Sequence, residues 1–302
     1  MIFLMGPTAS GKSALGLTLA RESGMEIINA DSVQIYRGMT IGSAKPTPEE
    51  QRLVVHHLLD VTDPDQPWSA DRYREAAWER IHTLHARGVT PLFVGGSGLY
   101  LRAVEQGLAL TPPIDPTLLA AIRAEADQWG WPRLHQRLRQ VDPDSAGRIT
   151  VNDGQRILRA LSVYTATGLT LSRWQQEQPP PPPWRMLKLA LMPPRALLYP
   201  RIEARLERMV AEGLLEEAQS LLDAGYDRNL PAMKAVGYRQ IFAGLEGSMP
   251  LAAAIDLAKQ ESRRYAKRQE TWLKRESGLI RLDDPLAPLE QARGLLRAFL
   301  RG

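Results

Sequence analysis

The residues best suited to chemistry lie near the start of the chain, where eight positions match the phosphate-binding pattern G-x-x-x-x-G-K-[ST]. A short apolar run precedes the pattern and a helix-forming segment follows it. Backbone N–H groups of such a loop surround phosphate oxygens at a helix N-terminus, while the lysine adds positive charge and the hydroxyl can bind Mg²⁺. We therefore predict a di- or triphosphate site formed by Gly6, Pro7, Thr8, Ala9, Ser10, Gly11, Lys12 and Ser13, with Ser13 as the metal ligand.

This loop does not define the rest of the ligand, because ATP and an organic diphosphate would make the same contacts. Two other polar segments, Asp31-Ser32 and the glycine-flanked Ser97, each follow an expected strand. Because the carboxyl ends of parallel strands meet at one edge of a sheet, we expect both segments to lie beside the phosphate loop. A carboxylate at Asp31 could bind Mg²⁺ or act as a general base. The alternatives are a capping aspartate and, at Ser97, an ordinary turn residue.

The segments that must position these residues alternate between strand-like and helix-like patterns. We expect strands at residues 2–5, 26–29, 90–94, 186–192 and 279–282, and helices at residues 12–21, 70–87 and 199–224. Ser69 is a plausible N-cap for the helix that begins at residue 70. Alternation of this kind predicts an α/β fold, with a parallel sheet flanked by helices.

A helical insertion interrupts this pattern. From residue 116 to about residue 168 the pattern is helical with no convincing strand, and the later run Pro179–Pro183 predicts a stiff polyproline II spacer. The predicted domains are therefore a core of residues 1–111 and 185–302 and an insertion of residues 112–184.

Composition excludes several classes of protein. The 302 residues include no cysteine, which rules out disulfides, a thiolate nucleophile and cysteine-ligated metals. No apolar stretch approaches the ~18 residues of a membrane span and no leader is evident, so we expect a cytoplasmic protein with no membrane partner. The net charge is only +4, but residues 259–281 hold eight basic and three acidic residues. That segment is either a solvated helix face or a surface for a polyanion.

Seven blocks, in the same order along nearly the whole chain, resemble the tRNA dimethylallyltransferases. They are the phosphate loop, DSVQIYRGMTIGSAKP (31–46), HHLLDVTDP (56–64), GGSGLYL (95–101), NDGQRILRAL (152–161), AVGYRQ (235–240) and KRQETWLK (267–274). The resemblance implies a P-loop NTPase-like fold. It also implies transfer of a dimethylallyl group from dimethylallyl diphosphate to N6 of adenosine 37, in tRNAs that read codons beginning with U. The products would be N6-dimethylallyladenosine and diphosphate, with Mg²⁺ as cofactor and a monomer as the working form.

The same resemblance assigns roles to individual residues. Asp31 would accept the proton or a hydrogen bond from the adenine N6 amine, and Lys12, Ser13, Ser97 and Arg201 would bind the diphosphate directly or through Mg²⁺. The implied catalytic set is Asp31, Lys12, Ser97 and Arg201. The implied tRNA contacts, of which Ser32, Val33 and Gln34 line the adenine site, are Asp31, Ser32, Val33, Gln34, Ser97, Gln155, Arg156, Ile157, Leu158, Arg159, Lys234, Ala235, Val236, Gly237, Tyr238, Arg239, Lys267, Arg268, Gln269, Trp272 and Lys274.

Departures from the family pattern are small. Ser43 and Ser97 stand where many relatives have threonine, and both keep the hydroxyl. Without cysteine the chain cannot form the zinc finger of eukaryotic relatives, which points to the compact bacterial type.

Three other functions remain open at this stage. They are a small-molecule or nucleotide kinase with ATP on the loop, a nucleotide-switched RNA-binding protein, and a prenyltransferase for free adenine nucleotides. The basic residues of the insertion either contact RNA phosphates or are ordinary surface residues; they are Arg133, Arg137, Arg139 and Arg148.

Overall fold

The chain forms two compact units in the computed structural model, which describes residues 1–302 apart from 67, 109–110, 178–183, 283–286 and 302. The core unit is Met1–Val104 with Pro183–Gly302, and the insertion is Glu105–Pro182. The sequence placed the boundaries of the insertion at residues 112 and 184. The expected polyproline spacer, Pro179–Pro183, lies outside the described residues.

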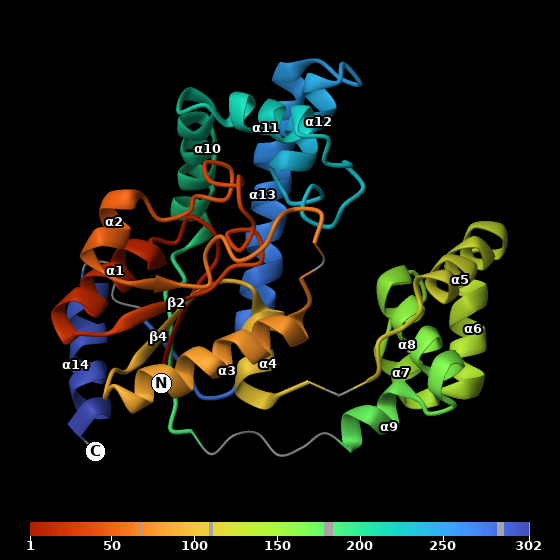
Figure 1. Cartoon of the computed structure of the whole chain (residues 1–302), viewed down its shortest axis with the longest axis horizontal. Helices are drawn as coiled ribbons and strands as arrows, with labels where there is room; N and C mark the ends of the chain where they lie inside the picture. The colour runs from red at the N-terminus through yellow and green to blue at the C-terminus, as the bar shows by residue number, and fades with distance from the viewer. Residues whose placement is uncertain (67, 109–110, 178–183, 283–286, 302) are drawn as a thin grey trace. The chain divides into compact units, whose positions relative to one another are not determined.

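A parallel sheet organises the core unit (Figure 1). In the described residues its strands follow the order β3-β2-β4-β1-β5-β6, and every neighbouring pair is parallel. The strands are β1 (Ile2–Met5), β2 (Glu26–Ala30), β3 (His56–His57), β4 (Pro91–Gly95), β5 (Leu187–Ala190) and β6 (Leu279–Arg281). The predicted α/β fold with a parallel sheet is therefore confirmed. The two-residue β3 was missed, because so short a strand has no periodicity to detect.

Both faces of the sheet are buried, as the short apolar strands require. Successive strand residues point to opposite faces. Ile2 and Leu4 therefore pack with residues of α1 and α14, whereas Phe3 and Met5 pack with residues of α3 and α4. These helices and the short α2 are α1 (Lys12–Ser23), α2 (Pro48–Leu53), α3 (Ala70–Ala86), α4 (Gly98–Gln106) and α14 (Pro288–Arg301). Ser69 caps α3 as predicted, since its side chain accepts a hydrogen bond from the Arg72 N–H.

Helices from the second half of the chain complete the core unit beside the carboxyl edge of the sheet. They are α10 (Arg195–Ala211), α11 (Leu214–Asp223), α12 (Tyr238–Leu245) and α13 (Leu251–Leu273). The prediction of one helix over residues 199–224 is wrong, because Gly213 adopts φ 107° and separates α10 from α11. That left-handed conformation suits glycine and ends the first helix. α10 and α13 pack against each other (Figure 1).

The insertion has a hydrophobic core of its own. Apolar residues from α5, α6 and α8 pack together, with Leu134, Leu138, Ile157 and Leu161 completely buried. Its helices are α5 (Pro116–Trp129), α6 (Trp131–Val141), α7 (Pro143–Arg148), α8 (Gly154–Thr167) and α9 (Leu171–Gln176).

The strand order brings three loops together, because β2, β4 and β1 are neighbours and each is followed by one of the loops singled out above. The loop after β4 approaches the phosphate loop closely at Gly96, where a Cβ would lie 2.9 Å from the Gly6 carbonyl oxygen and 2.3 Å from Gln269 Nε2. Gln269 bridges the loops, since its Oε1 accepts from the Thr8 N–H (2.8 Å) and its Nε2 donates to the Gly96 carbonyl (3.0 Å). Convergence of the loops is confirmed.

We expect Gly96→Ala to destabilise the core unit by about 1–3 kcal/mol, because the added methyl has no room between backbone and a buried amide. Gly294→Ala is the matched control: Gly294 lies in α14 with open space around its Cβ, so that change should be neutral or slightly stabilising. Urea unfolding followed by circular dichroism measures both. Equal stabilities for the two variants would contradict the close packing of the loops.

Candidate active site

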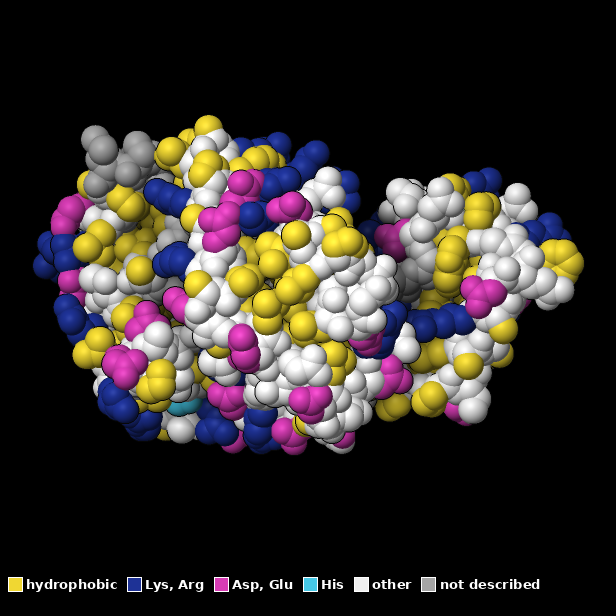
Figure 2. All heavy atoms as spheres, turned by 90° about the horizontal axis from the view of Figure 1, so that it is seen from above, with side chains coloured by type: hydrophobic (Ala, Val, Ile, Leu, Met, Phe, Trp, Pro, Cys, Tyr) yellow, Lys and Arg dark blue, Asp and Glu magenta, His cyan; other side chains and the backbone are white. Residues whose placement is uncertain are grey.

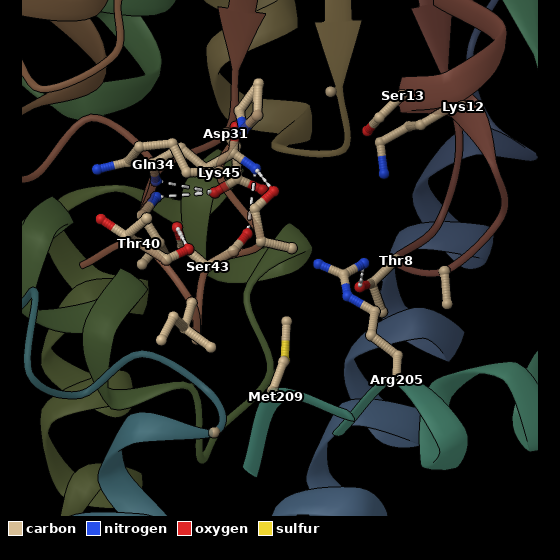
Figure 3. A pocket seen from close by; sticks show the side chains of 18 of the residues that line it. Thr8, Lys12, Ser13, Asp31, Gln34, Thr40, Ser43, Lys45, Arg205 and Met209 are labelled. Atoms are coloured by element: carbon tan, nitrogen blue, oxygen red, sulfur yellow. Dashed lines mark hydrogen bonds between the residues drawn. The ribbon is translucent and has the colours of Figure 1, made fainter. Parts of the chain in front are cut away.

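A cavity of about 1020 Å³ opens where the three loops meet α10, α13 and the segment before α12. All its lining residues belong to the core unit. Figure 3 shows two opposed groups of side chains. We call the group of Thr8, Lys12, Ser13 and Arg205 the phosphate-loop wall. The opposite group, formed by Gln34, Thr40 and Ser43, is the Gln34 wall.

The phosphate-loop wall has the backbone geometry of an anion site. Gly11 caps α1 in the left-handed conformation with φ 94°, and Ala9 also has a positive φ of 60°. Among the described residues the N–H groups of Ala9 and Gly11 have no hydrogen-bond partner, so they remain available to phosphate oxygens. Lys12 Nζ donates to the Pro7 carbonyl oxygen at 3.2 Å, and the Arg205 guanidinium donates to Thr8 Oγ1 at 3.3 Å.

The positive charges of Lys12 and Arg205 repel each other in this wall. Burial lowers the pKa of the Lys12 ammonium to about 8, and the positive charge of Arg205 adds to the effect while Asp31 opposes it. Burial likewise lowers the pKa of Arg205. Repulsion and desolvation of this kind are relieved when a polyanion binds, so the wall is suited to a diphosphate.

The Asp31 side chain is held in place by the turn that follows it. Its Oδ1 accepts hydrogen bonds from the N–H groups of Val33 (2.8 Å) and Gln34 (3.4 Å). In the described part of the chain Oδ2 has no hydrogen-bond partner, and Asp31 lines the cavity. One carboxylate oxygen is therefore fixed while the other can accept a proton or hydrogen bond from a ligand.

Ser97 contacts the Asp31 segment rather than the cavity itself. Its Oγ accepts from the Ser32 N–H at 3.0 Å and donates to Ser32 Oγ at 3.3 Å. The neighbouring Tyr265 of α13, which sequence reasoning missed, does line the cavity. Burial, assisted by the charge of Asp31, raises the pKa of the Tyr265 phenol to about 12, while Ser97 has the opposite effect. Tyr265 therefore remains a hydrogen-bond donor at neutral pH.

Hydrogen bonds within the segment after β2 hold the residues of the Gln34 wall in place. Gln34 Nε2 donates to the carbonyl oxygens of Ser43 (3.1 Å) and Ala44 (2.9 Å). The buried Lys45 ammonium donates to the Tyr36 carbonyl oxygen and pairs with Asp60 at 2.6 Å. The blocks at 31–46 and 56–64 are therefore linked to each other at the cavity.

Arg201 and Arg205 lie one turn apart on α10, and both line the cavity. Arg201 is solvent-exposed and, within the described residues, makes no hydrogen bond to the phosphate loop, whereas the Arg205 guanidinium donates to Thr8 Oγ1. The sequence resemblance selected Arg201 alone. Arg205 was not among the predicted site residues, so the structure adds it to the phosphate-loop wall.

The predicted tRNA-contacting residues divide by burial. Ile157 and Leu158 belong to the core of the insertion, and Tyr238 and Gln269 are buried in the core unit. Their side chains support the fold in this structure instead of forming a surface. Trp272 is half-buried beneath the Arg102 guanidinium. The predicted contacts that are exposed are Gln155, Arg156, Arg159, Lys234, Arg239, Lys267, Arg268 and Lys274.

Several basic residues are neutralised by nearby acids. In the insertion Arg137 pairs with Glu125 at 2.8 Å, whereas Arg148 donates a hydrogen bond to the neutral Gln175 amide and keeps its charge. On α13, Lys259 pairs with Glu207 of α10, and Arg263 pairs with Glu203 of the same helix. On the face in Figure 2, Lys and Arg (dark blue) are interspersed with Asp and Glu (magenta). Part of the basic segment at 259–281 is therefore structural.

In the ranges that the structure describes, no helix is long and apolar enough to cross a membrane. Those ranges also contain no cluster of three or more His, Asp or Glu side chains arranged to hold a metal ion.

A six-stranded parallel sheet with a phosphate loop after its central strand β1 defines an α/β protein of the P-loop NTPase-like class. Residues 34–276 match the model of the IPP transferase family. The chain belongs to this family, as the seven blocks predicted.

Similar proteins agree with this assignment. The tRNA dimethylallyltransferase of Magnetococcus marinus is 52% identical over 302 residues, covering 98% of each chain. The solved structure of the tRNA isopentenylpyrophosphate transferase of Bacillus halodurans is similar with a TM-score of 0.73 and 34% identity, covering 99% of this chain and 96% of the other. A eukaryotic dimethylallyltransferase, solved while acting on tRNA, shares the fold with a TM-score of 0.83 at 24% identity, covering 100% of this chain and 79% of the other.

We expect affinity for an alkyl diphosphate to fall as the pH rises above about 8, because the lowered pKa of Lys12 means that its charge is lost there. Below that pH the ammonium is already protonated and the affinity should be level. An alkyl diphosphate is fully ionised above about pH 7, so its own titration does not interfere. Titration calorimetry measures the profile. Lys12→Arg, which keeps its charge, should give a flat profile, and a wild-type profile equally flat would contradict the assignment.

Proposed function

We propose that this chain transfers a dimethylallyl group from dimethylallyl diphosphate to N6 of adenosine 37 in tRNAs that read codons beginning with U. The observation that carries the proposal is the opposition of a cationic phosphate-loop wall and a carboxylate across one cavity, in a chain of this family. A diphosphate leaving group needs the cations of the phosphate-loop wall, and an amine nucleophile needs the carboxylate to take its proton. Membership of a family whose relatives are named for tRNA supports tRNA as the acceptor.

The chemistry assigns a task to each wall. The bond between the allylic carbon and the diphosphate oxygen breaks, and negative charge builds on the diphosphate. Lys12, Arg205 and the free backbone N–H groups of the phosphate loop stabilise that charge. The lone pair of N6 forms the new bond to carbon. Asp31 takes the proton that N6 releases, through the carboxylate oxygen that the turn leaves free.

Mg²⁺ is proposed as the cofactor, with Ser13 as its protein ligand. In the described residues the Ser13 hydroxyl has no hydrogen-bond partner, and it lies in the first turn of α1 beside the loop. Mg²⁺ that binds phosphates takes only one or two protein oxygens and keeps several waters, so a single serine hydroxyl is a sufficient protein ligand. When bound, the ion would neutralise charge on the leaving diphosphate.

The acceptor base must leave the anticodon loop to enter the cavity, which costs a few kcal/mol and least in a single-stranded loop. Exposed basic residues are available to tRNA phosphates: Lys234 and Arg268 line the cavity, whereas Lys267 and Lys274 lie outside it. Because one core unit supplies every lining residue, we propose that a monomer is sufficient for activity.

The decisive experiment incubates the purified protein with Mg²⁺, unmodified tRNA and dimethylallyl diphosphate, with ATP replacing the prenyl donor in a parallel reaction. Mass spectrometry of the digested tRNA should show one dimethylallyl group on adenosine 37, only with the prenyl donor. ATP consumption without a prenyl adduct would favour a kinase or a nucleotide-switched protein. Prenylation of free AMP at the same rate would favour the small-molecule acceptor.

We expect Asp31→Asn to lower kcat by about 10²–10⁴-fold, because the amide cannot take the N6 proton. Its oxygen can still accept the Val33 and Gln34 N–H groups, so the turn should survive. The affinity for tRNA, measured by filter binding, should change by less than about threefold. Unchanged turnover in Asp31→Asn would contradict the assignment of Asp31 as the general base.

We expect joint replacement of Lys267, Arg268 and Lys274 by glutamine to weaken tRNA binding and to flatten its dependence on salt concentration. All three side chains are exposed. Lys259→Gln is the control, because the Lys259 ammonium already pairs with Glu207 at 2.8 Å. If the triple variant and the control bind tRNA alike over a salt series, these residues form an ordinary solvated face.

A further inference from the structure

We propose that Glu217 is a positioning residue that sets the Gln34 wall for the acceptor base, an inference that rests on the proposed function. Glu217 lies in the first turn of α11 and outside all seven sequence blocks. It does not line the cavity. Its carboxylate instead holds the loop that does.

The carboxylate accepts four hydrogen bonds. Oε2 accepts from the N–H groups of Thr40 (2.8 Å) and Ile41 (2.7 Å), and Oε1 accepts from the Gly42 N–H (3.0 Å). Oε1 also accepts from the Tyr238 hydroxyl at 2.6 Å. Three successive backbone donors therefore converge on one anion. Charge-assisted bonds of this kind are among the stronger ones in proteins, and no neutral side chain offers the same two acceptor atoms.

Close packing shows that the loop is fitted to this anion. A Cβ on Gly42 would lie 2.5 Å from the Tyr238 ring and 2.8 Å from Leu214 Cδ1, so only glycine allows the loop to approach α11 and α12 this closely. Tyr238 is fully buried. Burial and the Glu217 charge raise the pKa of the Tyr238 phenol, which keeps it protonated and donating.

The segment of residues 40–44 links the Glu217 carboxylate to the Gln34 side chain, which lines the cavity. The residues that directly follow the three bound N–H groups are Ser43 and Ala44, whose carbonyl oxygens hold Gln34 Nε2. Because both partners are acceptors, the Gln34 amide has one orientation. Figure 3 shows Gln34, Thr40 and Ser43 together, across the cavity from Lys12 and Arg205. Glu217 therefore restrains the Gln34 wall, and within the described residues its carboxylate makes no hydrogen bond to the phosphate-loop wall.

The test compares Glu217→Gln with Glu216→Gln, which makes the same charge change in the same turn on an exposed side chain. The amide at position 217 loses one acceptor atom to an NH₂ group that faces backbone donors. We expect kcat/KM for tRNA to fall by about tenfold or more, as misplacement of a substrate-positioning group does, with KM for dimethylallyl diphosphate unchanged within twofold. Glu216→Gln should match the wild type in both.

Hydrogen exchange of the substrate-free protein gives a readout independent of turnover. The Thr40, Ile41 and Gly42 amides should exchange faster in Glu217→Gln than in Glu216→Gln. Equal exchange, or equal losses for tRNA and for the prenyl donor, would overturn the proposal. If the wild-type protein forms no prenyl adduct, the proposed function is wrong. The exchange data would still show whether the Glu217 carboxylate holds the Thr40, Ile41 and Gly42 amides. Should Glu217→Gln fail to fold, Tyr238→Phe removes one bond to the carboxylate and should show the same split at about threefold.

Discussion

The close approach of three loops at the carboxyl edge of the sheet is the constraint on which the site depends. The phosphate loop follows β1 and Asp31 follows β2, with β4 between them. Two strand spacings of ~4.8 Å therefore separate the groups, about 10 Å in all. That interval accommodates a diphosphate at one end and an amine at the other with the reacting carbon between them. The sheet is buried on both faces, so the interval cannot relax without disturbing the core.

Helices from the second half of the chain form the other walls of the cavity at this edge of the sheet. α10 contributes Arg205 to the phosphate-loop wall, α13 contributes Tyr265 near Asp31, and Gln269 of α13 joins the phosphate loop to the loop after β4. α11 anchors the opposite wall through Glu217. α10 and α13 also carry exposed cations, so side chains available to tRNA stand on the same helices that form the cavity.

Sequence patterns predicted the parts of the site that local chemistry determines. The phosphate loop, Asp31 and Ser97 each follow a buried strand, and strand ends in a parallel sheet have one place to meet. Arg205 was missed because one turn of helix separates it from Arg201, and only the packing of α10 decides which of them points at Thr8. Tyr265 and Glu217 act through contacts with residues more than 150 positions away, which no local pattern reveals. The buried Tyr238 and Gln269 stand in blocks that resemble tRNA-binding segments, yet their side chains stabilise the loops.

The insertion has a consequence for the order in which the protein is made. β1 lies near the middle of the sheet and leaves the ribosome first, but its neighbour β5 begins at Leu187. The edge of β1 that pairs with β5 therefore has no partner strand until the whole insertion has been synthesised. The insertion has a separate core and can close on itself during that interval. Once folded, the insertion buries most of its apolar residues, so they cannot pair with the open edge of β1 in place of β5. An insertion that folds poorly would therefore first cause aggregation of nascent chains.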